Sequence, residues 1–424
     1  MTEFSSILVI SGVAVVAPLM NRLAIFARMP RVALELLLGI MVGPSVAGLV
    51  APDDTLNFLG ELGLVYLFFQ AGFEFKQKEI GLAPLRLGAL AWLASFALSI
   101  AIVTLLYFLG LVRTPLLVAL ILPTTAFGVL IPVLRQTNDL HNSFGRHVLG
   151  SAAAGELGPL ILASIVLAHE KHHLHQTFLS LMFLALAVGT VFALTNMRSE
   201  RLSERILTLM NDGGILPVRI ALLVLLAFIA LASQFGMEIV VGAYTAGMAV
   251  SILVSGTKAE ILEDQLMAIG TGFFVPLFFI KSGADFDLHS LYASPEHFAR
   301  FLLFSLAFIF IRIAPLNIYK KALPERDLPA LALLSSTTLP LVVAITYLGV
   351  QSGQMMPENA SALVGAAIMT VTIFPTLAFW LRAQPAEATQ SSALYALTRR
   401  IADWMSTQFD RAAARLPEEW RARL

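Results

Sequence analysis

The sequence has no cysteine and few charged residues. Without cysteine, neither a disulfide framework nor a thiolate metal site can form. Charged residues make up 13% of the 424 positions, against about 25% in a soluble domain. Acidic and basic residues are equal in number, at 28 each, which argues against nucleic acid as a partner. The hydrophobic share of 58% and the mean hydropathy of +0.81 predict a polytopic membrane protein.

Long apolar runs occupy most of the chain. A membrane-spanning helix needs about 20 mostly apolar residues, and thirteen such runs predict an all-α fold with about thirteen transmembrane helices. The N-terminus lacks the positive region of a signal peptide, so we expect the first run to be retained. The approximate runs are 5–27, 31–50, 56–75, 86–109, 114–134, 145–169, 176–197, 215–236, 238–255, 266–285, 296–319, 327–350 and 358–382. We therefore expect one transmembrane domain over 1–382 and a short cytoplasmic tail over 383–424.

Lysine and arginine are distributed unequally between alternate loops. Loops after odd-numbered runs, with the tail, hold 22 of them, whereas the opposite side holds only Arg113 and Lys171. Basic loops stay in the cytoplasm. The distribution therefore predicts a protein of the cell (inner) membrane with its N-terminus outside and its C-terminus in the cytoplasm.

Several runs resemble each other at nearly one offset. VYLFFQAGFEF begins at Val65 and VPLFFIKSGADF at Val275, and LPTTAFGV from Leu122 has a counterpart in SSTTLPLV from Ser335. The segments GIMVGPSVAGLV and GAYTAGMAVSILV lie at a compatible distance. An offset of seven helices reverses the orientation in the membrane. The pattern predicts two inverted six-helix repeats, over about 5–169 and 215–382, joined by a linking helix over 176–197. Such repeats are typical of secondary transporters.

The fifth and twelfth runs are interrupted at matching places. Pro123 precedes Thr124 and Thr125 in one run, and Thr337 and Thr338 lie beside a proline in the other. Proline removes a backbone donor, and unwound backbone within a membrane must line a cavity or be buried in protein. We expect these runs to cross as unwound segments. Ordinary kinks in packed helices are the alternative.

One carboxylate lies in the middle of the sixth run. Glu156 is eleven residues from the start of this run, hence about 16 Å deep in a core about 30 Å thick. An ionisable group at this depth usually marks an ion or proton pathway, although it could also only join two helices. Burial favours its neutral form. The deprotonated carboxylate could hold a dehydrated cation, together with oxygens of Thr124, Thr125, Thr337 or Gln70.

Two basic residues also lie within runs. Arg312 lies in FIFIRIAPLNIYK and Lys281 in FFIKSGADF. A buried arginine stays charged and requires a carboxylate, so both residues are candidate charge partners of Glu156; snorkelling to the interface is the alternative. We expect Glu74 to be an interfacial helix-end anchor, and the histidine cluster at 169–175 to be a solvated outer loop.

Together these residues resemble the monovalent cation:proton antiporter-2 family, which includes Kef-type and bacterial Na⁺/H⁺ exchangers. The resemblance covers about residues 5–382 and rests on LELLLGIMVGPSVAG, LGELGLVYLFFQAGFEF, GRHVLGSAAAGELGPLILA and VPLFFIKSGADFDL. It implies the Na⁺/H⁺ antiporter fold, a homodimer, no cofactor, and exchange of Na⁺, K⁺ or Li⁺ for H⁺ by alternating access, with a role in pH homeostasis. It also implies that Glu156 binds the ion, and it places Thr124, Thr125, Thr337, Thr338 and Arg312 at matching positions.

The sequence departs from this family in three places. The family usually has aspartate at the Glu156 position, preceded by a polar residue, whereas this chain has Gly155. A lone glutamate favours one-for-one, electroneutral exchange. Lys281 replaces a residue that is usually uncharged. The nucleotide-binding domain of Kef-type members is missing, and the tail has apolar residues at helical spacing, which indicates an amphipathic helix on the inner leaflet or a packing helix.

Two other classes of function were considered. A sodium-coupled organic solute symporter would require a larger cavity and a second cation site built from several acids, but one deep acid is found. A cation channel or sensor with a transporter fold would require a filter-like carbonyl motif or a ligand-binding domain, and neither is seen. We expect no enzyme activity, because no nucleophile–base set and no metal cluster lies within the runs.

Overall fold

The structure, a computed structural model, describes most of the chain. The described residues are 3–23, 31–50, 53–75, 80–112, 115–168, 182, 186, 189–190, 215–235, 239–254, 257–289, 294–383 and 400. Their regular elements are all helices, without a strand in any of these ranges, which confirms the all-α prediction. The linking run at 176–197 lies almost wholly outside the described residues, as do the histidine cluster at 169–175 and the tail.

The helices follow the predicted runs closely. Among the described residues, seven helical stretches are long and apolar enough to cross a membrane: Asp54–Glu74, Leu82–Phe108, Ile215–Gln234, Ile261–Ala284, Pro295–Tyr319, Glu325–Val350 and Pro357–Arg382. Two shorter apolar helices cover Ser5–Met20 and Ile239–Leu253. The full count of thirteen stays a prediction.

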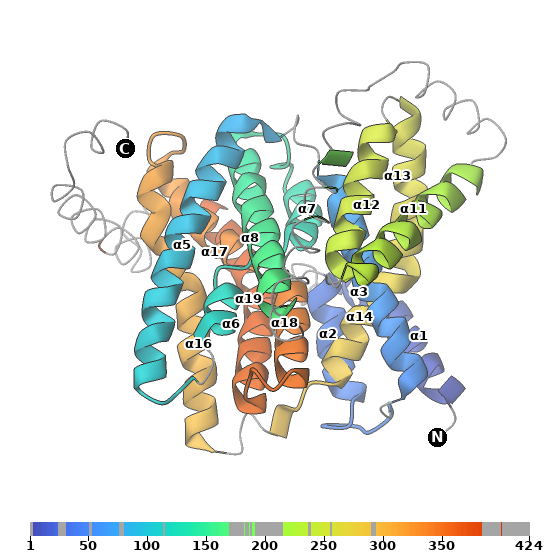
Figure 1. Cartoon of the computed structure of the whole chain (residues 1–424), viewed down its shortest axis with the longest axis horizontal. Helices are drawn as coiled ribbons and strands as arrows, with labels where there is room; N and C mark the ends of the chain where they lie inside the picture. Colours follow the sequence, from blue (N-terminus) through green and yellow to red (C-terminus); the bar gives the residue numbers. More distant parts are fainter. Residues whose placement is uncertain are drawn as a thin grey trace.

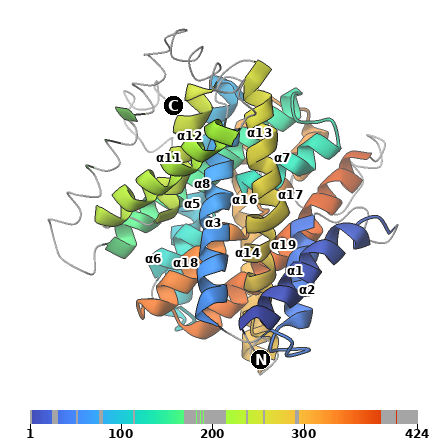
Figure 2. The ribbon, with the colours of Figure 1, turned by 90° about the vertical axis from the view of Figure 1, so that its right-hand side faces the viewer.

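The helices form two bundles that lie side by side (Figure 1). The first bundle contains α1 (Glu3–Met20), α2 (Arg31–Val42), α3 (Asp54–Glu74), α11 (Ile215–Gln234), α12 (Ile239–Leu253), α13 (Thr257–Ile269) and α14 (Val275–Ala284). A π-helical turn, η1 (Gly270–Phe274), joins α13 to α14. In this bundle α3 packs against α12 and α14, as Figure 2 shows from the side.

The second bundle contains the two interrupted runs. Its members are α5 (Leu82–Phe108), α6 (Pro115–Ile121), α7 (Phe127–Gln136), α8 (Ser143–Ala168), α16 (Pro295–Ile313), α17 (Leu328–Ser335), α18 (Pro340–Gln351) and α19 (Pro357–Ala383), with the 3-10 turns η2 (Ala314–Tyr319) and η3 (Glu325–Asp327). Here α8 packs on α5, and α19 packs on α16 and α17. The two bundles meet where α3 contacts α7, α12 contacts α8, and α2 contacts α19.

Glycines bring the helices of each bundle close together. A methyl group at Gly88 of α5 would lie 2.8 Å from the amide nitrogen of Ser151 on α8. A methyl group at Gly247 of α12 would lie 2.7 Å from the amide nitrogen of Phe73 on α3. Small residues permit such approach between membrane helices, so each pair is fixed by backbone contact.

Both interrupted runs are broken where the sequence predicts. The first run ends as α6 at Ile121 and resumes as α7 at Phe127, and the second ends as α17 at Ser335 and resumes as α18 at Pro340. In the stretch Glu325–Val350, which contains the second break, 94% of the apolar 18-residue window is buried, whereas the corresponding value in α11 is 22%. The unwound backbone is therefore enclosed by protein, while α11 presents an apolar surface.

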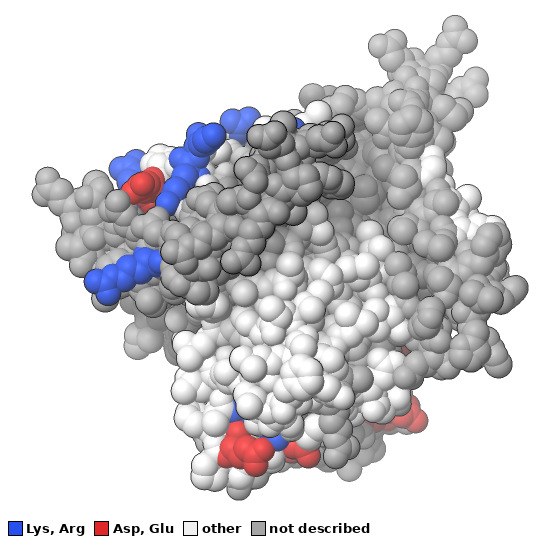
Figure 3. Space-filling view, turned by 60° about the vertical axis from the view of Figure 1, so that its left-hand side comes forward, with Lys and Arg blue, Asp and Glu red and all other residues white. Residues whose placement is uncertain are grey.

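Charge is separated along the molecule. In Figure 3, Lys and Arg lie mostly at the upper end of the visible face, and Asp and Glu mostly at the lower end. Uncharged surface lies between them. The upper end is also the end at which α7 and α13 lie in Figure 1. An uncharged band between charged ends is the surface that a bilayer requires.

Candidate ion-binding site

Backbone hydrogen bonds hold the two breaks together. The amide of Ala126 donates to the carbonyl of Thr337 at 2.8 Å, which joins the first break directly to the second. The amide of Thr125 donates to the carbonyl of Gly155 on α8 at 3.0 Å. A buried backbone group without a partner is costly, and these bonds replace those lost by unwinding. The expected crossing of the two segments is thus present.

The threonine side chains reinforce this crossing. The hydroxyl groups of Thr124 and Thr338 lie 2.7 Å apart, so each break contributes one member of a hydrogen-bonded pair. Thr125 Oγ1 donates to the carbonyl of Ser335 at 2.6 Å. The hydroxyl of Thr337 donates back into α17. These hydroxyl groups therefore bond to backbone carbonyls or to each other across the two breaks.

Glu156 lies beside the crossing on α8. Its side chain is buried, with 4% exposure, and Oε2 accepts the amide of Phe127 at 3.0 Å. Phe127 is the first residue of α7, and the N-terminus of a helix carries partial positive charge. The carboxylate is therefore stabilised by a helix end and not by a basic side chain, since within the described residues it forms no ion pair.

Arg312 contacts the other side of the crossing. Its guanidinium is buried, with 3% exposure, and donates through Nη2 to the carbonyl of Pro123 and, at 2.6 Å, to Thr125 Oγ1. The carbonyl of Pro123 follows the C-terminal end of α6, where negative partial charge collects. Arg312 thus neutralises a helix end. Its predicted pairing with Glu156 stays a prediction.

The side chains of Arg312 and Thr125 leave no room for a side chain at position 155. A methyl group at Gly155 would lie 2.8 Å from Arg312 Nη2 and 2.8 Å from Thr125 Cβ. The space that a polar side chain usually occupies before the carboxylate is here filled by the guanidinium and by Thr125. This contact explains why the chain has glycine at 155.

Gln70 and Lys281 lie away from this crossing. The amide nitrogen of Gln70 contacts the sulfur of Met267, and its oxygen faces Gly270 in η1. Lys281 forms an ion pair with Asp285 one turn along the chain. Within the described residues, neither side chain forms a hydrogen bond or ion pair with the crossing. Their predicted roles in ion binding stay predictions.

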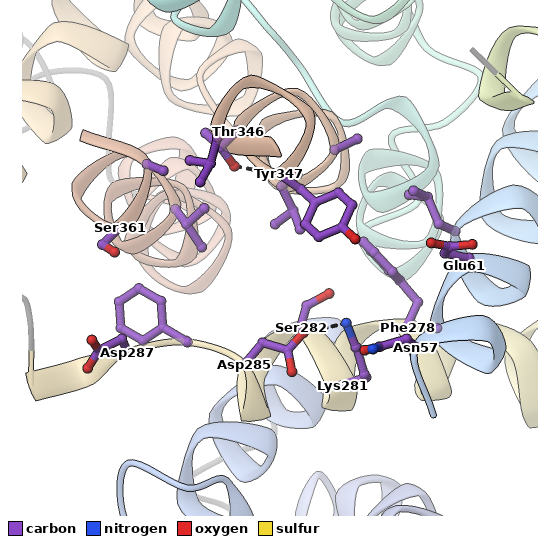
Figure 4. A pocket seen from close by; sticks show the side chains of 18 of the residues that line it. Asn57, Glu61, Phe278, Lys281, Ser282, Asp285, Asp287, Thr346, Tyr347 and Ser361 are labelled. Carbon is purple, nitrogen blue, oxygen red and sulfur yellow. Dashed lines mark hydrogen bonds and ion pairs between the residues drawn. The ribbon is translucent and has the colours of Figure 1, made fainter. Parts of the chain in front are cut away.

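Two cavities lie where the bundles meet. The first, here the inner cavity, has a volume of about 630 Å³, and the second, the outer cavity, about 320 Å³. The inner cavity is lined by residues that include Glu74, Phe127, Arg135, His141, Glu263 and Asp264. The outer cavity is lined by residues that include Asn57, Glu61, Lys281, Asp285, Asp287 and Tyr347 (Figure 4). Phe127 lines the inner cavity and its amide donates to Glu156, so the cavity comes within one residue of the carboxylate, which is not itself a lining residue.

Two further residues, Glu74 and Tyr244, interact electrostatically with Glu156 and were not predicted to do so from the sequence. We expected Glu74 to be an interfacial anchor, but it is buried in the inner cavity and interacts electrostatically with Glu156. Tyr244 on α12 also interacts electrostatically with Glu156, and its buried hydroxyl has no partner among the described residues. Both come from the first bundle. The acidic residue at the end of the FFQAGFEF segment could have indicated a role for Glu74. No sequence pattern indicated one for Tyr244.

The chain is similar to known exchangers over most of its length. A family described as "Sodium/hydrogen exchanger, transmembrane" matches residues 11–383. The Bacillus subtilis protein YjbQ, named for Na⁺/H⁺ antiport, is 26% identical over 89% of this chain and 63% of its own length. The chain thus spans less than two thirds of that relative. The high-affinity Na⁺/H⁺ antiporter NhaS3 of Synechocystis is 26% identical, over 78% of this chain and 72% of its own.

Further comparisons agree with these. The Na⁺/H⁺-K⁺ antiporter GerN of Bacillus cereus is 24% identical over 88% of this chain and 96% of its own length. Among solved structures, the sodium proton antiporter MjNhaP1 from Methanocaldococcus jannaschii matches with a TM-score of 0.62. This match covers 93% of this chain and 99% of that one, at 17% identity. At this identity the likeness concerns the fold alone.

Proposed function

Because the chain belongs to the transmembrane sodium/hydrogen exchanger family, we propose that it exchanges a monovalent cation, Na⁺ or K⁺, for H⁺ across the cell membrane. The observation that carries this proposal is the position of Glu156. It is buried at the N-terminus of α7, beside the crossing of two broken helices, and it bonds to Phe127, which lines the inner cavity. Broken helices of this kind form the ion sites of secondary transporters.

Coupling follows from competition for one carboxylate. When Glu156 holds a proton, the group is neutral and requires no cation. When it has lost the proton, the α7 end and the amide of Phe127 stabilise the charge, and a cation can bind with oxygens of the nearby threonines. Because proton and cation exclude each other, their movements are opposed. The carboxyl group is neutral when loaded with either ion, which supports electroneutral exchange.

The remaining charged groups have separate roles. Glu74, Glu263 and Asp264 line the inner cavity, and carboxylates in a narrow cleft concentrate cations there. Arg312 stays bound to the crossing and balances the α6 end in every step. Tyr244 faces Glu156 from the first bundle, so its hydroxyl can bond to the carboxylate or to a water on the bound cation.

Alternating access is supported by the two bundles. The inner and outer cavities both lie between the bundles, so a rocking motion that closes one would open the other. The basic end of the molecule supports a cytoplasmic side at α7 and α13, and hence an outer N-terminus. The matched breaks support inverted repeats within thirteen helices. The exposed apolar surface of α11 supports lipid contact or a homodimer on the side of the first bundle.

Proton flux in proteoliposomes tests the proposal. A pH dye is loaded, a pH gradient is imposed, and Na⁺, K⁺ or Li⁺ is added to wild type and to Glu156→Gln. We expect cation-dependent dissipation of the gradient in wild type and at least tenfold slower flux in the variant, because the amide cannot release a proton.

Two other outcomes would contradict parts of the proposal. Unchanged flux in Glu156→Gln would show that another residue binds the ion, and Glu74 would be the next candidate. An absence of flux with all three cations, in a folded wild-type protein, would contradict exchange and favour a sodium-coupled symporter or a sensor.

A further inference from the structure

Given the proposed exchange, we propose that Lys281 sets the affinity of the outer cavity for cations. Its ammonium group stands in the cavity and competes with arriving cations for the carboxylates there. Cations at the outer face therefore bind more weakly than they would without it. Nothing in the mechanism proposed above uses Lys281.

The position of Lys281 carries this inference. The residue lies on α14, its side chain is 16% exposed, and it lines the outer cavity. Figure 4 shows Lys281 beside Asp285 and Asn57, with Glu61 further along the same wall. The cavity also reaches Val343, three residues beyond Pro340, where α18 begins at the crossing. Lys281 thus lines the same cavity as the first turn of α18, which begins at the second break.

Gly60 leaves room for the lysine stem. A methyl group at Gly60 on α3 would lie 3.1 Å from Cδ of Lys281 and 3.4 Å from Cγ. The stem therefore lies along α3 with little space to spare. A long side chain held in this way has fewer conformations, so its charge stays in the cavity rather than swinging into solvent.

The charges of the cavity give the sign of the effect. Its lining contains three carboxylates, those of Glu61, Asp285 and Asp287, and Lys281 is the one basic residue among them. The net charge of the lining is therefore −2, which attracts cations, and without Lys281 it would be −3. Charges in a cleft with low-dielectric walls act more strongly than charges on an open surface. Removing the ammonium should raise the affinity for cations, and removing a carboxylate should lower it.

A purely structural role for the Lys281–Asp285 pair predicts a different pattern. If the pair only joined two turns of α14, Lys281→Gln and Asp285→Asn would break the same contact and change transport in the same direction. The proposed role predicts opposite directions. It also predicts that the double variant, which keeps the net charge of −2, returns towards wild type.

The experiment measures cation activation separately at each face. Right-side-out and everted vesicles are prepared from cells without other exchangers, and Na⁺-dependent proton flux is recorded at low ionic strength. For Lys281→Gln we expect the half-saturating Na⁺ concentration at the outer face to fall about 3- to 10-fold. For Asp285→Asn we expect it to rise by a similar factor. Lys281→Arg, which keeps the charge, should stay near wild type.

Two controls separate electrostatics from structure. The half-saturating concentration at the cytoplasmic face should not change in either variant. Raising the ionic strength with an impermeant salt should shrink the outer-face difference, because the charges are screened. Shifts of both single variants in one direction, or a shift at the cytoplasmic face, would overturn the role of Lys281. An unchanged half-saturating concentration at the outer face in both single variants, with active exchange in wild type, would also overturn this role. An absence of flux in wild type would overturn the exchange and this inference together.

Discussion

At the scale of single residues, the two buried charged groups of the site each interact with a helix end. Glu156 accepts the first amide of α7, and Arg312 donates to the carbonyl of Pro123 behind α6. Each ionised group thus lies at the helix end of opposite partial charge. The two side chains need not pair directly for both to remain buried. This differs from the expectation that a buried arginine requires a carboxylate.

Gly155 gives a prediction at this scale. In Gly155→Ala the new methyl group would displace the guanidinium of Arg312 and the side chain of Thr125, both 2.8 Å from its position. We expect exchange to slow about tenfold or more, because adding a methyl group to a tightly packed site costs about 1–3 kcal/mol. Flux in proteoliposomes checks this, and thermal stability in detergent shows whether the variant is folded.

The matched control is Gly12→Ala on α1. A methyl group there would meet no atom within 4 Å, so its flux should equal that of wild type. If Gly155→Ala exchanged at the wild-type rate, the close packing of glycine, guanidinium and threonine would not matter for transport.

The depth of a residue in the membrane could be predicted from the sequence, but the neighbours that its side chain contacts could not. Hydropathy placed Glu156 at mid-membrane, because a carboxylate within an apolar run has a measurable distance to each end. Gln70 was also expected to offer an oxygen to the ion, yet its side chain contacts Met267 and faces η1. Glu74 and Tyr244 approach Glu156 from another bundle, and such proximity depends on tertiary packing that no local pattern encodes.

At the scale of elements, the breaks were the most predictable feature. Proline and paired threonines marked both interruptions, because proline cannot continue the hydrogen-bond ladder and threonine can replace lost backbone partners. The π-helical turn at Gly270–Phe274 was not predicted. The tenth run was expected from 266, but helix extends back to Thr257. The segment before 266 is too polar to be counted as part of an apolar run.

Arg382 at the end of α19 gives a prediction for the second bundle. It donates to Asp139 at 2.6 Å and to Asp327 at 3.1 Å, and its guanidinium stacks over Phe144 at 3.9 Å. These contacts join α19 to the α7–α8 connection and to the turn before α17. Arg382→Ala should destabilise the protein by about 2 kcal/mol or more, because two carboxylates lose a charged hydrogen bond.

Thermal unfolding in detergent checks this prediction. Arg326→Ala, an exposed arginine close to Asp327, is the control and should change stability by about 0.5 kcal/mol or less. Equal unfolding temperatures for Arg382→Ala and wild type would show that this cluster does not hold the bundle together.

At the scale of the whole molecule, Glu156 is buried near the contact of two bundles, and two cavities lie between these bundles. Composition predicted the membrane location, whereas the orientation predicted from the alternation of basic loops stays a prediction. The division into bundles could not be predicted, because all the helices are similarly apolar and interleave along the chain. The repeats, the dimer and the helix count remain predictions.

The central claim is that proton and cation compete for Glu156. The most direct measurement is the half-saturating Na⁺ or K⁺ concentration of exchange at several pH values, at fixed ionic strength. We predict that this concentration rises about tenfold for each unit of acidification once the carboxylate is mostly protonated, while the maximal rate at saturating cation stays constant. A half-saturating concentration independent of pH, with a maximal rate that falls on acidification, would contradict a shared site.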